Sequence, residues 1–183
     1  YWAADLIDRM KNGNQPELPV VRWGILSTAA INEAIIRAIA MSPRSELIAV
    51  ASRTQEKGDN YAEKHGIPRA YGNYVELLND SDIDAVYISL PNSLHAEWIV
   101  KAAQAGKHVL CEKPLVISLD EFDAVEAAAR DFKVIVFEGF ANLHHPSIRH
   151  ALEMVESGVL GDVQSINGWG YFTVPPDDVD NIR

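Results

Sequence analysis

The sequence predicts an α/β fold with a doubly wound parallel sheet. The first observation behind this prediction is that short apolar runs alternate with segments of helical period from residue 20 to residue 157, which is the pattern of parallel strands joined by helices. The second is that two neighbouring apolar runs, 84–90 and 107–111, each end in polar residues. Ligands bind outside the carboxyl ends of the strands in such a sheet, so these two ends predict a site.

Turn residues delimit the elements of the first half. Ser42-Pro43 stops the first helix, because proline cannot continue one, and Gly66 closes the second. A turn over 27–31 leads into the first helix. The strands are expected at 20–26, 46–52 and 69–71, and the helices at 32–41, 55–65 and 74–79.

The second half repeats the same alternation. Pro91-Asn92 ends the fourth strand, Glu112-Lys113-Pro114 ends the fifth, and Gly158 ends the last helix. The strands are expected at 84–90, 107–111 and 133–138, and the helices at 94–105, 120–131 and 145–157.

The flanks of this pattern predict two further parts. Residues 1–19 predict a helical arm and linker, and residues 20–140 the dinucleotide-type sheet domain. The segment 162–174 alternates with aromatic residues and predicts a strand of a different, antiparallel sheet. We therefore expect 141–183 to be the incomplete start of a second domain. The aromatic residues of this segment, Trp169, Tyr171 and Phe172, predict an exposed apolar patch.

Composition narrows the classes of partner. The net charge of -10 argues against nucleic acid or a membrane surface as the main partner, since both favour a basic face. Cys111 is the only cysteine, which excludes an intrachain disulfide and fits a reducing cytoplasm; it is expected to be a small buried strand residue. No apolar run approaches the ~20 residues of a membrane span. The chain begins at Tyr1, so a removed targeting segment stays open.

The turn after the first strand is a candidate phosphate site. A dinucleotide site needs a tight strand-to-helix turn where backbone N–H groups approach a pyrophosphate. The run from Gly24 to Asn32 places Ser27, Ala29 and Asn32 where a glycine fingerprint has its small residues, and Thr28 adds a second hydroxyl that could donate to phosphate. An ordinary strand-turn-helix with a hydroxyl cap is the alternative. The cofactor-binding residues predicted for this turn are Gly24, Ser27, Thr28, Ala29 and Ile31.

The end of the second strand predicts which nicotinamide dinucleotide is bound. A carboxylate there would accept hydrogen bonds from the ribose of NAD and would repel a 2'-phosphate. This chain has Ser52-Arg53-Thr54 instead, with Lys57 one helical turn later. Ser52, Arg53 and Lys57 therefore favour NADP. The alternative is that Arg53 stacks on adenine, in which case NAD would serve as well.

Five ordered motifs together carry a family resemblance. The motifs are Trp23-Gly-Ile-Leu-Ser-Thr-Ala, Ser52-Arg53, Ile67-Pro-Arg-Ala-Tyr-Gly72, Leu90-Pro-Asn-Ser-Leu-His95 and Cys111-Glu-Lys-Pro-Leu115. With these motifs the chain resembles the Gfo/Idh/MocA oxidoreductases from about Val20 onward. Within that family it is most similar to dihydrodiol dehydrogenases, NADP-linked aldose dehydrogenases and glucose-fructose oxidoreductase.

The resemblance implies a Rossmann-type nicotinamide domain followed by a C-terminal α/β domain. In the family, the open antiparallel sheet of that second domain carries the substrate and usually the homo-oligomer contact. Two departures stand out. Leu143 stands where the family commonly has an arginine, and the chain ends where the second domain has barely begun. The segment that normally supplies the other catalytic residues is therefore not present, and we expect these 183 residues to be inactive by themselves.

Hydride transfer needs a proton relay on the substrate oxygen, and Lys113 is the candidate. Partial desolvation beside a cationic nicotinamide would favour its neutral amine. Glu112 could tether the ribose or hold the lysine. Pro91 and Asn92 are expected beneath the nicotinamide ribose, and the preceding Leu90 is also expected to bind the cofactor. His95 is expected either to touch a phosphate or to cap the following helix.

A metal is not expected. Adjacent histidines such as His144 and His145 point in different directions on a helix, and no carboxylate stands at ligand spacing. His145 is expected to be structural or a pocket wall.

Two hypotheses about function follow. The first is an NADP-dependent oxidoreductase acting on a sugar or a cyclic diol, with Lys113 as the acid-base residue. The second is a non-catalytic dinucleotide-binding sensor or regulatory module of the same fold, which Leu143 and the short second domain motivate. The full Glu112-Lys113-Pro114 set favours the enzyme, because a sensor needs no proton relay.

Overall fold

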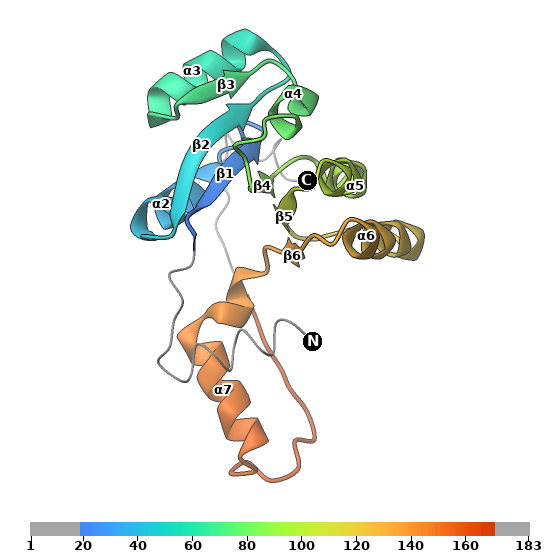
Figure 1. Cartoon of the computed structure of the whole chain (residues 1–183). Helices are drawn as coiled ribbons and strands as arrows, with labels where there is room; N and C mark the ends of the chain where they lie inside the picture. Colours follow the sequence, from blue (N-terminus) through green and yellow to red (C-terminus); the bar gives the residue numbers. More distant parts are fainter. Residues whose placement is uncertain (1–18, 171–183) are drawn as a thin grey trace. The chain divides into compact units, whose positions relative to one another are not determined.

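A computed structural model of the chain describes residues 19–170. These residues fall into two compact units that divide between Phe140 and Ala141. The first unit holds the sheet and the second a single long helix (Figure 1). The predicted arm at 1–18 and the last part of the predicted final strand, 171–174, lie outside the described residues.

The first unit is built on one six-stranded sheet, and its neighbouring strands all pair in parallel. The strand order is β3-β2-β1-β4-β5-β6, so the order reverses between β1 and β4. The strands are β1 (Val21–Leu26), β2 (Ser45–Ala51), β3 (Arg69–Tyr71), β4 (Ala85–Ile88), β5 (His108–Cys111) and β6 (Val136–Glu138).

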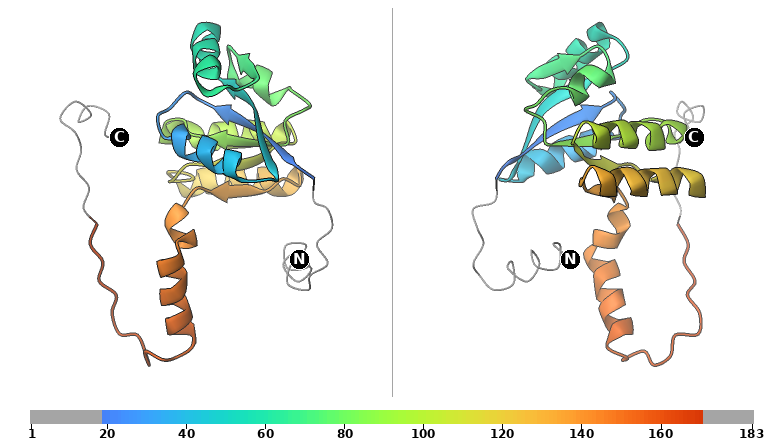
Figure 2. Two further views of the ribbon diagram at one scale, coloured as in Figure 1. Left: turned by 90° about the vertical axis from the view of Figure 1, so that its left-hand side faces the viewer. Right: turned by 45° about the vertical axis from the view of Figure 1, so that its right-hand side comes forward.

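Helices cover both faces of the sheet, as Figure 2 shows. On one face Leu77, Ile99 and Val125 of three helices pack against alternate strand residues such as Leu26. On the other face Ile36 and Ala62 of two helices pack against neighbouring strand residues. The first set of helices comprises α4 (Tyr74–Leu78), α5 (His95–Gln104) and α6 (Leu119–Asp131), and the second comprises α2 (Asn32–Met41) and α3 (Gln55–His65). This arrangement confirms the predicted doubly wound parallel sheet.

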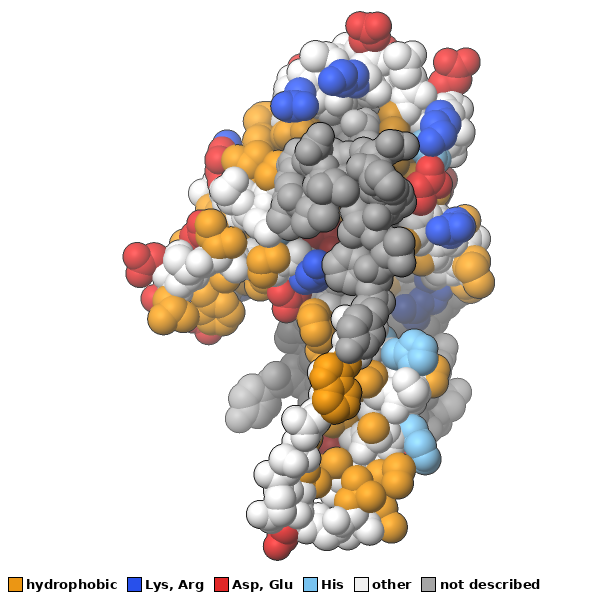
Figure 3. Space-filling model, turned by 180° about the vertical axis from the view of Figure 1, so that it is seen from behind, with side chains coloured by type: hydrophobic (Ala, Val, Ile, Leu, Met, Phe, Trp, Pro, Cys, Tyr) orange, Lys and Arg blue, Asp and Glu red, His pale blue; other side chains and the backbone are white. Residues whose placement is uncertain are grey.

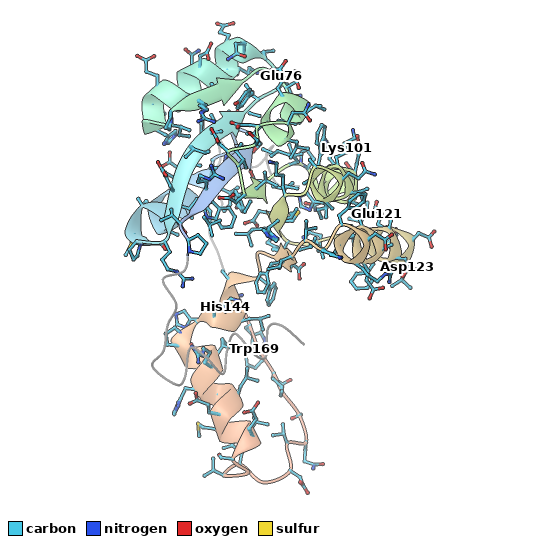
Figure 4. The ribbon with its side chains drawn as sticks, in the orientation of Figure 1. Glu76, Lys101, Glu121, Asp123, His144 and Trp169 are labelled. Carbon is cyan, nitrogen blue, oxygen red and sulfur yellow. The ribbon has the colours of Figure 1, made fainter. Side chains whose placement is uncertain are left out.

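Short polar residues fix where several helices begin. Thr54, Asn73 and Ser118 are N-caps whose side chains accept from a backbone N–H three residues later, which satisfies a donor that the helix leaves unpaired. Gly66 ends α3 with a left-handed φ of 67°, the predicted cap. The outer helices carry solvated charges such as Glu76 of α4, Lys101 of α5 and Asp123 of α6 (Figure 4).

An ionic contact ties β1 to β4 at the amino ends of these strands. Arg22 is the second residue of β1, and Asp84 directly precedes β4. The guanidinium of Arg22 donates from Nη2 to Asp84 Oδ1 (2.9 Å) and from Nε to Asp84 Oδ2 (3.0 Å), while the backbone N–H of Arg22 also donates to Oδ2 (2.9 Å). This contact lies at the opposite end of the two strands from the predicted site.

The sixth strand is shorter than expected. The apolar run predicts a strand from residue 133, whereas β6 begins at Val136. Lys133 has a φ of 55°, and the N–H of Val134 donates back to the carbonyl of Ala129 in α6. The first residues of the run therefore close the preceding helix, and only the remainder can join the edge of the sheet.

The second unit contains a short 3₁₀ turn, η2 (Ala141–His144), and the helix α7 (Pro146–Glu156). His145 is the N-cap of α7, because its Nδ1 accepts from the N–H of Ser147 at 3.2 Å, so the structural role expected for His145 is confirmed. Hydrophobic side chains are exposed on this unit (Figure 3); they include Leu152, Val159, Ile166 and Trp169.

The prediction of a strand at 162–174 is wrong for its described part. Residues 162–170 form no strand, because none of the described residues pairs with them, and an isolated strand leaves its backbone groups unpaired. Trp169 is 80% exposed, as the sequence predicts for an uncovered aromatic residue.

Candidate functional site

The site predicted from the sequence lies at the carboxyl ends of the central strands. The loops that follow β1 and β4 leave neighbouring strands, and their helices α2 and α5 pack on opposite faces of the sheet. A crevice outside the strand ends is expected at this reversal of strand order. The loops after β2 and β5 flank it on either side.

Ser27, directly after β1, adopts an unusual backbone conformation. Its φ is 125°, a region that glycine reaches freely and other residues rarely adopt. The Ser27 hydroxyl shares a 2.7 Å hydrogen bond with that of Ser89, which follows β4, and it also accepts from the N–H of Ala29 (3.2 Å). Side-chain hydrogen bonds therefore hold the backbone of this turn at positive φ. A glycine at the same place would adopt that conformation without such hydrogen bonds.

Asn32 completes this network inside the turn. Its side chain is fully buried, its Nδ2 donates to the carbonyl of Ser27 (3.0 Å), and its Oδ1 accepts from the Ser89 hydroxyl (2.6 Å). The hydroxyl of Ser27 is thus engaged within the turn, and Thr28 is the half-buried hydroxyl beside it. The N-cap of α2 is Ile31, which makes no side-chain capping bond, so the alternative of a hydroxyl-capped helix is wrong.

The end of β2 presents positive charge to solvent. Ser52 is buried and its N–H donates to the carbonyl of Tyr71 (3.0 Å), which continues the sheet. Arg53 and Lys57 are exposed at the start of α3. Burial raises the pKa of Tyr74, and the positive charge of Arg53 opposes part of that rise. Residues 52–55 therefore carry one cation, Arg53, and no carboxylate, and the first turn of α3 adds Glu56 and a second cation, Lys57.

Glu112, directly after β5, is held by its neighbours. Its N–H donates to the carbonyl of Ile88 (2.9 Å), and its Oε1 accepts from the hydroxyl of the buried Tyr87 (2.6 Å). Burial, and then the hydrogen bond to Glu112, raise the pKa of Tyr87, so Tyr87 stays the donor of this pair. A Cβ at Gly139 would lie 3.2 Å from the Cys111 carbonyl and 3.5 Å from Glu112 Oε1, which explains the glycine there.

Lys113 is exposed at the same strand end. The bond between Lys113 and Pro114 is cis, and the N–H of Leu115 donates to Oε1 of Glu138, at the end of β6 (2.8 Å). The partial desolvation expected for Lys113 is not provided by the first unit, where the side chain faces solvent.

His95 has a position that the sequence did not predict. The side chain is fully buried in the first turn of α5. Its Nε2 lies 2.8 Å from the carbonyl oxygen of Leu90, and its Nδ1 lies 2.8 Å from that of Pro114. Neither ring nitrogen is left for a phosphate, and neither caps α5, so both expected roles of His95 are replaced by a bridge between two loops.

The remaining predicted residues divide between packing and exposure. Gly24 lies within β1, where an added Cβ would stand 2.8 Å from Leu77 Cδ2, so close packing of α4 explains its glycine. Leu90 is buried, Pro91 is half-buried, and Asn92 is exposed. The turn at 27–31, Arg53, Asn92 and Lys113 thus all follow the carboxyl ends of strands, on the same side of the sheet. Gly24 lies in the core behind them.

Sequence reasoning missed three residues that hold this edge. Ser89 and Tyr87 belong to β4 and its end, and Gly139 follows β6. Tyr87 and Ser89 are two residues apart in the predicted strand, so their side chains lie on the same face of the sheet. That spacing, together with the polar Asn32 in the neighbouring turn, is the sequence signal from which their role could have been predicted. Nothing in the sequence marks Gly139, because its close contact is with a distant strand.

The part of the chain that the structure describes holds neither a metal-type cluster nor a membrane-length helix. In residues 19–170 no three His, Cys, Asp or Glu side chains gather as a metal site would need. Over the same part of the chain, no helix is long and apolar enough to cross a membrane.

A family model described as an oxidoreductase family with an NAD-binding Rossmann fold matches residues 21–140. The chain is 44% identical over 161 residues to D-xylose 1-dehydrogenase (NADP(+)) 2 of Haloferax volcanii, covering 88% of this chain and 49% of that protein. It is 36% identical over 159 residues to trans-1,2-dihydrobenzene-1,2-diol dehydrogenase of Xenopus laevis, covering 84% and 48%. The chain therefore spans about half the length of the curated relatives it matches.

Two solved oxidoreductase structures are similar to this chain in fold and in sequence. KijD10, a 3-ketoreductase from Actinomadura kijaniata solved with NADP, superimposes with a TM-score of 0.71 at 38% identity, over 78% of this chain and 46% of that one. An NAD-binding oxidoreductase from Klebsiella pneumoniae superimposes with a TM-score of 0.73 at 31% identity, over 78% and 40%.

Proposed function

Because the chain belongs to the Gfo/Idh/MocA family of oxidoreductases, we propose that it serves NADP-dependent hydride transfer between a sugar or a cyclic diol and the nicotinamide. The observation that carries the proposal is the end of β2. Arg53 and Lys57 are exposed there, and no carboxylate stands where NAD would need one. Positive charge at this place matches a 2'-phosphate.

The residues at the strand ends fit a dinucleotide. The turn at 27–31 is held from inside by buried side chains, so its outer surface consists of backbone, the small residues Thr28, Ala29 and Ala30, and the exposed side chain of Ile31. Small residues let a pyrophosphate approach the backbone and the start of α2. When bound, the nicotinamide supplies the hydride acceptor or donor. Arg53 and Lys57 would hold the 2'-phosphate, and Asn92 would lie near the nicotinamide ribose.

Lys113 is the proposed acid-base residue. Its ammonium would donate a proton to the substrate oxygen during reduction, and its amine would take one during oxidation. Glu112 uses Oε1 to accept from Tyr87, so its Oε2 would be the atom that accepts from a ribose hydroxyl or from Lys113. The Tyr87 contact keeps that carboxylate in one orientation, which a defined reaction geometry requires.

The substrate class and the setting are parts of the same proposal. A xylose dehydrogenase, a dihydrodiol dehydrogenase and a sugar 3-reductase are among the relatives. The substrates in these three names all carry a hydroxyl or keto group on a ring or an aldose. We place the reaction in the cytoplasm, consistent with a single buried cysteine. A homo-oligomer formed through the C-terminal region is also part of the proposal.

The test of Lys113 is its replacement by alanine. We expect turnover of aldoses or cyclic diols by the complete gene product to fall by about 100-fold or more, while the Kd for NADPH changes by less than about threefold. Lys101→Ala on the outer face of α5 is the matched control and should retain turnover. Unchanged turnover in Lys113→Ala would contradict the assignment, and would favour a dinucleotide sensor if the wild-type protein also binds NADPH without turning over any substrate.

A further inference from the structure

His95 joins the two loops that carry the proposed cofactor and proton-relay residues. One of its partners, the Leu90 carbonyl, directly precedes Pro91-Asn92 after β4, and the other, the Pro114 carbonyl, directly follows Lys113 after β5. The ring is fully buried, so water cannot replace either partner. A change at His95 must therefore reach both loops at once.

The two partners also determine how many protons the His95 ring carries. Both are carbonyl oxygens, which only accept hydrogen bonds, and a neutral imidazole donates from one nitrogen alone. A neutral ring would leave a nitrogen lone pair facing an oxygen at 2.8 Å. We propose that His95 is a positioning residue that donates from both ring nitrogens, and that it thereby fixes the separation of Asn92 and Lys113.

The charge on such a ring must be stabilised by its two carbonyl partners. Among the described residues, no ion pair is found for His95; on its own helix, Glu97 pairs with Lys101 instead. Lys113 and Glu112 lie on the neighbouring loop, where Glu112 accepts from Tyr87, and Glu121 of α6 accepts from the N–H of Ile117. The start of α5 disfavours a cation, so the two charge-assisted bonds to carbonyl oxygens must outweigh that cost.

The donor state can be measured on the wild-type chain. We expect ¹⁵N-histidine NMR at neutral pH to show a directly bonded proton on both Nδ1 and Nε2 of His95, with the signals assigned by their loss in His95→Gln. A bare nitrogen on either position would overturn the proposal. This measurement needs no cofactor, so it decides the state of His95 even if the proposed function fails.

The positioning role is tested by amide hydrogen exchange. The N–H of Leu94 donates to the Pro91 carbonyl, and that of Leu115 donates to Glu138, so these two amides report on the two loops. In His95→Ala we expect both to exchange at least about tenfold faster, since two charge-assisted hydrogen bonds are lost. His65→Ala is the control, because His65 is also largely buried but lies at the end of α3. Equal exchange in the two variants would overturn the role.

The consequence for binding rests on the proposed function. If the wild-type chain binds NADPH, His95→Ala should weaken that binding about tenfold relative to His65→Ala. Equal NADPH affinity in the two variants would overturn the inference that the bridge sets the cofactor site. Failure of the wild-type chain to bind NADPH would count against the function alone, since the NMR and exchange results stand without it.

Discussion

At the residue scale, the turn after β1 depends on a serine in a conformation that glycine adopts freely. Ser27 has a φ of 125°, which costs on the order of 1–3 kcal/mol for a residue with a Cβ. Its hydroxyl, together with Ser89 and Asn32, recovers part of that cost through buried hydrogen bonds. The site is therefore held by a polar network in place of a glycine.

A pair of substitutions separates the backbone cost from the hydrogen bonds. Ser27→Ala and Ser27→Gly both lose the hydroxyl, but only the alanine keeps a Cβ at positive φ. We expect the glycine variant to have the larger free energy of unfolding, by about 1 kcal/mol, measured by urea denaturation. Equal stability of the two variants would mean that the backbone at this turn is not strained.

The thiol of Cys111 should be unreactive in the folded protein. It is fully buried, as the sequence predicts, and burial raises its pKa to about 12. Because the thiolate is the reactive form, we expect iodoacetamide at neutral pH to alkylate it at least about 100-fold more slowly in the folded chain than in urea. A rate in the folded chain that matches the urea rate would show that the end of β5 is open.

At the element scale, β1 and β4 are joined by side-chain contacts at both of their ends. The amino ends of β1 and β4 are tied by Arg22 and Asp84, while their carboxyl ends carry Ser27 and Ser89. The hydrogen bonds from Arg22 are the main reason that the pKa of Asp84 lies below its ordinary value. The two contacts align the same pair of strands from opposite ends, and only one of them belongs to the site.

The Arg22–Asp84 contact gives a stability difference with a defined pH dependence. The folded-state pKa of Asp84 is lowered, so its stabilisation is present above the ordinary value of about 3.9 and is lost as pH falls through the lowered value. We expect Asp84→Asn to unfold at lower urea concentration than wild type at neutral pH, with the gap narrowing as the pH falls below the ordinary carboxyl value of about 3.9. Asp123→Asn on the exposed surface of α6 (Figure 4) is the control. A gap that persists unchanged in acid would rule out the charge as its cause.

The elements were largely predictable, because their signals are local. Gln55–His65 and Arg69–Tyr71 form at the predicted bounds, and a capping threonine and Gly66 mark the two ends of the helix. The start of β6 could not be predicted, since it depends on how the chain leaves α6 at Lys133. The segment 162–170 alternates like a strand, but a strand also needs a neighbour, and alternation alone does not supply one.

The site was predictable in place but not in detail. Strand ends could be found from apolar runs, so the positions of Arg53, Asn92 and Lys113 at one edge follow from the sequence. The contacts of His95 with Leu90 and Pro114 could not be found, because they join residues whose proximity only the folded sheet creates. Polar residues assigned to a ligand from sequence can therefore belong to the scaffold that shapes its site.

At the scale of the whole molecule, the two units differ in how well they bury their apolar residues. The first unit has a core on both faces of its sheet. In the second unit, large hydrophobic side chains of α7 and the following segment are exposed, among them Ile148, Leu152 and Trp169. The cofactor proposal rests on the first unit alone, whereas the substrate and oligomer proposals concern the second region as well.

The most direct test of the account is a fluorescence titration of the full chain with NADPH and with NADH. Arg53 and Lys57 at the end of β2 predict that NADPH binds at least about tenfold more tightly. Arg53→Asp should reverse the order, because a carboxylate repels the 2'-phosphate and accepts from the ribose of NADH. Equal or tighter binding of NADH by the wild-type chain, or an order unchanged by Arg53→Asp, would contradict the assignment of this strand end.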